Sequence, residues 1–215
     1  MIFQKGQKLV CIGDSTTDSG RSRPVGEGFN EALGKGYVAN LDALITTVYP
    51  EMNLRIVNMG TSGNTVKDLE ARWKADVEEL KPDWVSIMIG INDVWRQHDN
   101  ARQSETHVLL PEYRETITRL VKRTKPKVKG IILMTPYFIE PNQNDAMRKM
   151  LDTYGSAIKD LASQESLILV DTQLAIDSLL KHYYSAMFAW DRVHPNHVAN
   201  MAVTRAFLNA VGFKW

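Results

Sequence analysis

Several features that mark secreted, membrane-spanning or nucleic-acid-binding proteins are scarce or missing in this sequence. Its single cysteine, Cys11, cannot form an internal disulfide, and it lies in an apolar run typical of a buried strand. This cysteine usage is typical of a reducing compartment. No apolar run approaches the roughly 18 residues that a transmembrane helix requires. The sequence therefore predicts a protein that does not cross a membrane and does not depend on disulfides.

An excess of charge of one sign is also missing. Lys and Arg number 26 against 25 Asp and Glu, which leaves a formal net charge of +1, and basic residues form only short runs. Nucleic acids and anionic membranes are therefore poor candidate partners. Residues 1–8 contain neither a long apolar segment nor a small-residue cleavage site, so we expect a cytoplasmic protein without a signal peptide.

Two common enzyme signatures are absent as well. The sequence contains no Gly-x-Ser-x-Gly, which argues against the α/β-hydrolase type of nucleophile turn. It contains no Gly-x-Gly-x-x-Gly and no phosphate-binding loop, so nucleotide binding has no support. We expect an activity that requires no cofactor.

What is present is an alternation of short apolar runs and longer amphipathic segments over 215 residues, a length that fits one domain spanning residues 1–215. The predicted strands are nearly continuously apolar, as in parallel sheets buried on both faces: 9–12, 54–57, 84–89, 128–134 and 167–170. Helical periodicity predicts helices at 37–48, from 111, and at about 65–80, 143–164, 172–182 and 196–211. We therefore expect a three-layer α/β/α domain with about five parallel strands.

Four polar clusters fall just after predicted strands or before the last helix, where ligands bind in such sheets. They are Gly-Asp-Ser at 13–15, Gly-Thr-Ser-Gly-Asn at 60–64, Gly-Ile-Asn-Asp at 90–93 and Asp-Arg-Val-His-Pro at 191–195. Each cluster alone is an ordinary turn sequence. Their combination in this order predicts one site at one edge of the sheet.

The residue types in these clusters suit acyl transfer. Ser15 is a candidate nucleophile, and His194 can serve as its base because an unperturbed imidazole titrates near pH ~6.5. Asp191 lies on the same side of a turn and could fix the imidazole tautomer. The backbone N–H groups of Ser15 and Gly63 and the amide of Asn92 could stabilise a developing oxyanion.

In pattern, these clusters resemble the SGNH, or GDSL, hydrolase family from Cys11 to His197, with Thr16 in place of the family's usual leucine. The resemblance implies a flavodoxin-like fold, hydrolysis of esters or thioesters, and the roles given above for Ser15, Gly63, Asn92, Asp191 and His194. Further stretches, such as Arg72-Trp73 and 87–97, look like bacterial intracellular acetylxylan esterases of this family. That closer resemblance implies that the substrates are acetylated xylo-oligosaccharides. It also implies that the protein forms a homo-oligomer, and a ring-shaped octamer is one assembly that it suggests.

The aromatic residues near the clusters agree with a sugar substrate. Trp190, Tyr184 and Trp95 offer flat faces on which a sugar ring can pack. Trp95 fits a substrate pocket and a subunit contact equally well. Trp73 and Trp84 are expected to be core residues.

Several alternatives stay open at this point. Ser15 could be only a helix N-cap, and Asn92 and Asp93 could be turn formers. Asp191, His194 and His197 could form a zinc-binding face, although a helix beginning near Pro195 would turn His197 away, and we expect no metal. The same triad would also serve a short-chain lipolytic esterase or an acyl thioesterase, and a carbohydrate-binding protein could keep the fold without the chemistry.

Overall fold

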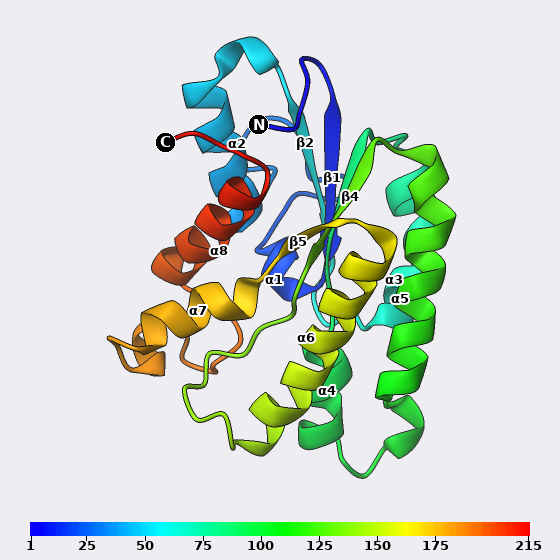
Figure 1. Ribbon diagram of the computed structural model, residues 1–215, viewed down its shortest axis with the longest axis vertical. Coiled ribbons are helices and arrows are strands. Elements are labelled where there is room, and N and C mark those ends of the chain that lie inside the picture. Colours follow the sequence, from blue (N-terminus) through cyan, green and yellow to red (C-terminus); the bar gives the residue numbers. More distant parts are fainter.

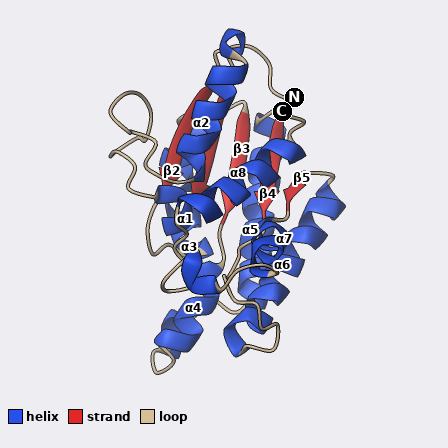
Figure 2. Cartoon of the chain, turned by 90° about the vertical axis from the view of Figure 1, so that its left-hand side faces the viewer, coloured by secondary structure: helices blue, strands red, loops and turns tan.

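The computed structural model describes residues 1–215 and shows one parallel sheet between two layers of helices (Figures 1 and 2). The strand order is β2-β1-β3-β4-β5. The strands are β1 (Lys8–Gly13), β2 (Arg55–Gly60), β3 (Trp84–Met88), β4 (Gly130–Met134) and β5 (Ile168–Val170). This order is that of flavodoxin-like sheets, so the predicted architecture is confirmed.

Eight α-helices surround the sheet: α1 (Ser15–Asp18), α2 (Tyr37–Val48), α3 (Val66–Trp73), α4 (Ile91–Asp99), α5 (Leu110–Thr124), α6 (Ala146–Glu165), α7 (Thr172–Leu180) and α8 (His197–Ala210). In Figure 1, α2, α7 and α8 lie on the left of the sheet, and α3 and α5 lie on its right. Helix α6 belongs to the same layer as α3 and α5, because its buried side chains share their apolar cluster. Helix α4 packs against α6 at the lower end of the molecule (Figure 1). The two helical layers explain why the strands must be apolar on both faces.

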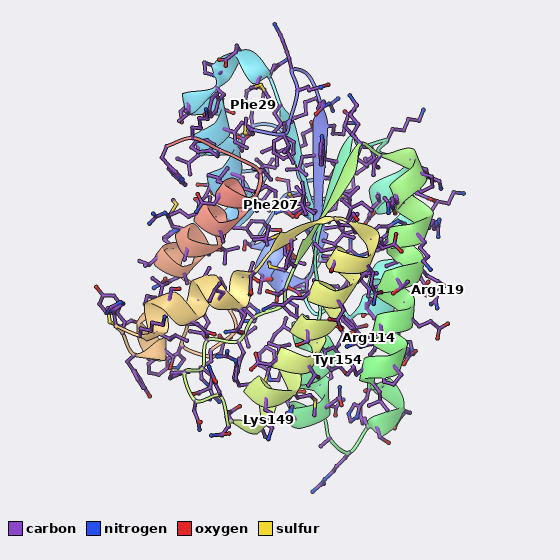
Figure 3. The ribbon with its side chains drawn as sticks, viewed as in Figure 1. Phe29, Arg114, Arg119, Lys149, Tyr154 and Phe207 are labelled. Carbon is purple, nitrogen blue, oxygen red and sulfur yellow. The ribbon has the colours of Figure 1, made fainter.

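Strand β1 shows this burial in its alternation. Leu9 and Cys11 face the cluster formed with α2 and α8, whereas Val10 and Ile12 face the cluster formed with α3, α5 and α6. All four side chains are fully buried. Phe207 of α8 points toward the sheet and belongs to the first cluster (Figure 3). The continuous apolar run that the sequence shows at 9–12 is therefore the signature of a central strand.

The two tryptophans expected in the core differ in their burial. Trp73 is fully buried, and its indole Nε1 donates to Thr124 at 3.0 Å, which confirms the prediction. Trp84 is only partly buried and packs edge-on against Phe3, with ring centroids 5.5 Å apart. It opens β3 at the end of the sheet away from the polar clusters, so its core role is confirmed only in part.

Helix α4 is the main element that the sequence pattern did not predict. Only two of its buried side chains, Ile91 and Val94, are apolar, so the sequence shows no apolar period there. Its many polar residues, such as Asn92, Asp93 and Asp99, are more typical of a turn. Gly90 precedes it with φ at +134°, a backbone conformation that side chains rarely adopt. The segment predicted as one helix at about 65–80 is also shorter, because α3 ends at Trp73 and a π-helical turn, Lys74–Glu78, follows.

Strand register brings the polar clusters to one edge of the sheet. Gly13 at the end of β1 pairs with Gly60 at the end of β2 and with Met88 at the end of β3. The segments that follow these three strands therefore leave the sheet side by side, next to the point where the strand order reverses. None of the helices combines the length and the apolar character that crossing a membrane would require.

Candidate active site

Ser15 is the first residue of the short helix α1, directly after β1. Asp14 caps this helix, because its carboxylate accepts from the backbone N–H of Thr16 at 2.9 Å and from the Thr16 hydroxyl at 2.8 Å. A Cβ atom at Gly13 would collide with the Met88 carbonyl oxygen, so a glycine is required before the turn. The turn thus holds the Ser15 side chain at the carboxyl edge of the sheet, partly exposed to solvent.

His194 and Asp191 lie on the turn before α8, and Asp191 shapes that turn. Its Oδ1 accepts from the backbone N–H groups of Val193 at 3.0 Å and His194 at 2.9 Å. The turn is also tied to the loop after β4, because Ile139 donates to the Arg192 carbonyl at 2.8 Å. The Arg192 guanidinium pairs with Glu140 at 2.6 Å. These contacts fix the turn against the loop after β4, from which it is far away in the chain.

The three side chains form one hydrogen-bonded chain. The distance from His194 Nε2 to Ser15 Oγ is 2.8 Å, and the distance from His194 Nδ1 to Asp191 Oδ2 is 2.5 Å. Burial alone would raise the pKa of Asp191, but its hydrogen bonds from the His194 ring and from the backbone outweigh this and hold the pKa below its usual range. A carboxylate therefore faces the imidazole, in the arrangement that activates a serine hydroxyl.

The three proposed oxyanion donors each have an N–H group without an acceptor in the protein. Gly63 has φ at +82°, and its backbone N–H has no acceptor in the protein. The Asn92 amide is buried and donates one N–H to the Asn64 carbonyl at 3.0 Å, which leaves its second N–H unused. The backbone N–H of Ser15, at the first position of α1, has no intrahelical acceptor either. Open space surrounds the Cα of Gly63, so its backbone conformation is what requires glycine there.

The three aromatic residues predicted to contact a sugar occupy two places. The Trp95 ring lies 6.1 Å from the His194 ring, and the Arg96 guanidinium lies 5.0 Å from the centre of the Trp95 ring. Trp190 and Tyr184 are 92% and 75% exposed and line a cavity of about 350 Å³ that Arg192 also borders. Trp95 is thus next to the base, while Trp190 and Tyr184 flank the turn that carries it.

His197 does not join the other residues of the proposed zinc-binding face. It begins α8 after the N-cap Asn196 and lines a different cavity together with Gly28 and Lys35. No three His, Cys, Asp or Glu side chains are grouped so that they could hold a metal ion.

Asn64 and Arg72 belong to the site, although the sequence patterns that contain them gave neither of them a role there. Asn64 receives the Asn92 amide through its backbone carbonyl, and its side chain accepts from Arg72 Nε at 2.6 Å. Arg72 lies in the last turn of α3, where an arginine is usually a solvated charge. Only the three-dimensional contacts show that it reaches the loop of Gly63.

Asp93 is a buried acid at the base of the site. Its Oδ1 accepts from the backbone N–H of Val66 at 3.0 Å, but its Oδ2 has no hydrogen-bond partner. Burial, the largest cause, acts together with the nearby charges of Asp14 and Asp68 to raise the pKa of Asp93 to about 8. Most of its carboxyl groups therefore carry a proton at pH 7. The turn-forming role expected from the sequence becomes a link between the first turns of α3 and α4.

The substitution Asp93→Asn tests this neutral state. The folded protein keeps the proton up to about pH 8, whereas the unfolded chain releases it near pH ~4. The folded state therefore binds more protons between these values, and the free energy of unfolding falls as the pH rises, by at most about 1.4 kcal/mol per pH unit from this group. The asparagine amide of the variant cannot titrate and keeps the acceptor for Val66, so the variant loses this dependence.

Urea unfolding of both proteins at about pH 5 and about pH 8 measures the effect. We expect the stability of the variant relative to the wild type to increase with pH. The unpartnered amide of the variant adds a cost of about 1–3 kcal/mol that does not depend on pH. A stability difference that is the same at both pH values would show that Asp93 is ionised in the folded protein.

The chain is similar to known proteins in both sequence and structure. Residues 11–200 match the GDSL-like Lipase/Acylhydrolase family. An acetylxylan esterase of Geobacillus stearothermophilus is 56% identical over 215 residues, which are 100% of this chain and 98% of that protein. The crystal structure of Axe2, an acetylxylan esterase from the same organism, matches with a TM-score of 0.99 at 55% identity, over 100% of this chain and 98% of Axe2.

A second solved structure, LAE5, described as an α/β hydrolase enzyme from the metagenome of Lake Arreo in Spain, has a TM-score of 0.97. It is 53% identical and covers 99% of this chain and 98% of its own. Structures of Axe2 described as catalytic mutants carry S15A, D191A and H194A, and this chain has serine, aspartate and histidine at the same numbers. The sequence match, the shared fold and the hydrogen-bonded Ser-His-Asp arrangement lead to one conclusion. The chain belongs to the GDSL-like lipase/acylhydrolase family.

Proposed function

We propose that the protein is a serine esterase that removes O-acetyl groups from xylo-oligosaccharides, with Ser15 as nucleophile, His194 as base and Asp191 as the group that orients the base. The observation that carries this proposal is the hydrogen-bonded chain from Ser15 Oγ through the imidazole to Asp191 Oδ2, with distances of 2.8 and 2.5 Å. A binding protein has no need of this arrangement. No cofactor takes part in the proposed reaction.

In the first step, Ser15 Oγ attacks the acyl carbonyl carbon while His194 Nε2 takes the hydroxyl proton. The carbonyl π electrons move to its oxygen, and the N–H groups of Ser15, Gly63 and Asn92 stabilise that oxyanion. Collapse of the tetrahedral intermediate breaks the bond to the sugar oxygen. His194 gives its proton to that oxygen, so the deacetylated sugar leaves as an alcohol and an acetyl-enzyme remains.

In the second step, water replaces the sugar. His194 Nε2 takes a proton from the water as the water oxygen attacks the acetyl carbonyl. The same donors stabilise the second oxyanion. Its collapse breaks the bond to Ser15 Oγ, returns the proton to that oxygen and releases acetic acid, which then loses its own proton to the solvent. The carboxylate of Asp191 stabilises the imidazolium that forms in both steps.

The substrate class rests on the relatives and on the surroundings of the base. Both proteins named as acetylxylan esterases match the chain over its whole length. Trp95, beside His194, could stack on the sugar that carries the leaving oxygen, and Trp190 and Tyr184 would extend this platform.

A hydrolysis panel tests the proposed substrate. It compares acetylated xylo-oligosaccharides with acyl thioesters and with 4-nitrophenyl esters of increasing chain length. We expect the highest kcat/KM for acetylated xylo-oligosaccharides and a steady fall as the acyl chain of the nitrophenyl esters lengthens. A preference for thioesters or for long acyl chains would instead indicate an acyl thioesterase or a lipolytic esterase with the same triad.

The substitution Asn92→Ala tests the oxyanion role. We expect kcat for 4-nitrophenyl acetate to fall by about 10²–10³-fold with little change in KM, because the lost N–H acts on charge that develops in the transition state. Asn100→Ala, a change in the same residue type just after α4, serves as the control and should leave kcat unchanged. A fall of less than threefold in Asn92→Ala would exclude this role.

We also propose that the protein acts in the cytoplasm as a homo-oligomer. The lone thiol, Cys11, is buried and unpaired, as is usual in a reducing compartment. Large apolar side chains are exposed close together in the segment before the turn of His194, among them Tyr184, Met187 and Trp190, and Tyr184 and Trp190 line one cavity. A contiguous apolar patch of this kind favours subunit contacts. Light scattering coupled to gel filtration would give the molar mass, and a mass near the 24.4 kDa of one chain would refute the oligomer.

A further inference from the structure

Arg72 makes four hydrogen bonds at the carboxyl edge of the sheet. Its Nη2 donates to the Gly13 carbonyl at 2.8 Å, and its Nη1 donates to the Met59 carbonyl at 2.7 Å. Its Nε donates to Asn64 Oδ1 at 2.6 Å. The remaining N–H of Nη1 pairs with Asp76 Oδ2 at 2.6 Å. One guanidinium thus holds the ends of two strands and the loop that follows the second.

Three of these acceptors lie in the segments that carry residues of the reaction centre. The Gly13 carbonyl is two residues before Ser15, and Asn64 directly follows Gly63. Met59 is the next-to-last residue of β2, from which the loop of Gly63 departs. Arg72 therefore links the segment of the nucleophile to the loop of one proposed oxyanion donor.

The same loop continues the connection to Asn92. The Asn64 carbonyl accepts from Asn92 Nδ2 at 3.0 Å, and Val66 donates to Asp93 Oδ1 at 3.0 Å. These two contacts join residues 64–66 to the first turn of α4. The bond to the Asn64 carbonyl also fixes the orientation of the Asn92 amide. A carbonyl oxygen can accept only from an N–H, so the amide nitrogen of Asn92 must face Asn64.

We propose that Arg72 is a positioning residue that sets the placement of Gly63 and Asn92 relative to Ser15, acting through Asn64. This inference rests on the proposed function, because it assigns Arg72 a part in stabilising the oxyanion of that reaction. The guanidinium itself points to backbone carbonyls and to Asn64 and Asp76, so it is not proposed to touch the substrate.

Arginine is suited to this role in a way that lysine is not. Its planar fork presents donors in fixed directions, whereas a lysine ammonium is a single point from which three separated acceptors cannot all be reached. Arg72→Lys would retain the charge opposite Asp76 but lose the connection between Gly13 and Asn64. A merely electrostatic role would survive this substitution, and a positioning role would not.

The test measures kcat and KM of Arg72→Lys with 4-nitrophenyl acetate. We expect kcat to fall by about 10- to 100-fold, the size of effect that a small misplacement of catalytic groups can cause, while KM changes less than threefold. Arg119→Lys is the matched control, because Arg119 on α5 pairs with Glu70 of α3 at the surface (Figure 3). That variant should keep the wild-type kcat.

A double-mutant cycle with Asn92→Ala separates positioning from general loss of structure. Because Arg72 is proposed to place Asn92 as well as Gly63, the fall in kcat caused by Arg72→Lys should be at least threefold smaller in the Asn92→Ala background than in the wild type. A smaller difference between the two backgrounds would overturn the proposal, and so would a kcat of Arg72→Lys within threefold of the wild type.

Asn64→Ala keeps the test decisive if Arg72→Lys does not fold. It removes only the side-chain link to Arg72 and leaves the backbone carbonyl that binds Asn92, so we expect a fall in kcat of about tenfold. A value within threefold of the wild type would then overturn the proposal. A wild-type protein without esterase activity would overturn the proposed function and this inference together, whereas an active wild type with an unimpaired Arg72→Lys overturns the inference alone.

Discussion

Replacement of Ser15 by alanine is expected to lower kcat for any ester substrate by about 10⁴–10⁶-fold. The Ser15 hydroxyl is the only group in the arrangement that can form the acyl-enzyme, so its loss closes the two-step route. Its one side-chain hydrogen bond is to His194, and the turn around it is held by Asp14 and Thr16. The folded structure should therefore persist, with a change in unfolding free energy within about 0.5 kcal/mol.

Rates measured with 4-nitrophenyl acetate, together with labelling by a serine-reactive phosphonate, check this expectation. The wild type should bind one equivalent of the phosphonate at Ser15, and the variant should bind none. Ser163→Ala, on the exposed surface of α6, is a matched control that should react like the wild type. If Ser15→Ala kept more than a hundredth of the wild-type kcat, or if the phosphonate labelled another residue, Ser15 would not be the nucleophile.

The strands could be predicted from the sequence because burial on both faces leaves a direct trace. Val10 and Ile12 of β1 pack against one helical layer, and Leu9 and Cys11 pack against the other, so all four of these central positions must be apolar. Helix α2 was equally clear, since its apolar period runs from Tyr37 until Pro50 stops it. Such periodic signals depend on burial alone.

The grouping of Ser15, Asp191 and His194 could be anticipated for a topological reason. Segments that follow parallel strands leave the sheet at one edge, and the spacing of Asp191 and His194 puts both on one turn. Their contact distances could not be anticipated, because they depend on the loop after β4. There the Arg192 carbonyl accepts from Ile139, a contact between residues 53 positions apart in the printed sequence.

Helix α4 and the role of Arg72 could not be predicted. The polar first turn of α4 is buried because Asn92 and Asp93 bind the loop at 64–66, and no periodicity records such contacts. Arg72 binds the carbonyls of Gly13 and Met59, and every residue carries a carbonyl, so the sequence holds no mark of these acceptors. Tertiary hydrogen bonds to the backbone decide both features.

The substitution Asp191→Asn is expected to lower kcat by about 10⁴-fold while the fold stays intact. Asparagine keeps the oxygen that accepts from the backbone of Val193 and His194, so the turn survives. The atom facing His194 Nδ1 becomes an amide nitrogen, which can only donate. The imidazole must then carry its proton on Nε2, the nitrogen that faces Ser15 Oγ at 2.8 Å, and it can no longer take the hydroxyl proton.

Asp171→Asn provides a matched control for this prediction, because Asp171 also accepts from a backbone N–H group, that of Leu174 at the start of α7, but contacts neither a histidine nor the turn of His194. Its kcat should equal that of the wild type. In Asp191→Asn, thermal unfolding should change little, whereas Asp191→Ala should lose both the turn contacts and the imidazole contact. A loss in kcat below tenfold for Asp191→Asn would mean that the tautomer of His194 is fixed by another group. Equal unfolding midpoints for the Asn and Ala variants would mean that the carboxylate contributes to the imidazole alone, and that the turn is held by the contacts of Arg192 with Ile139 and Glu140.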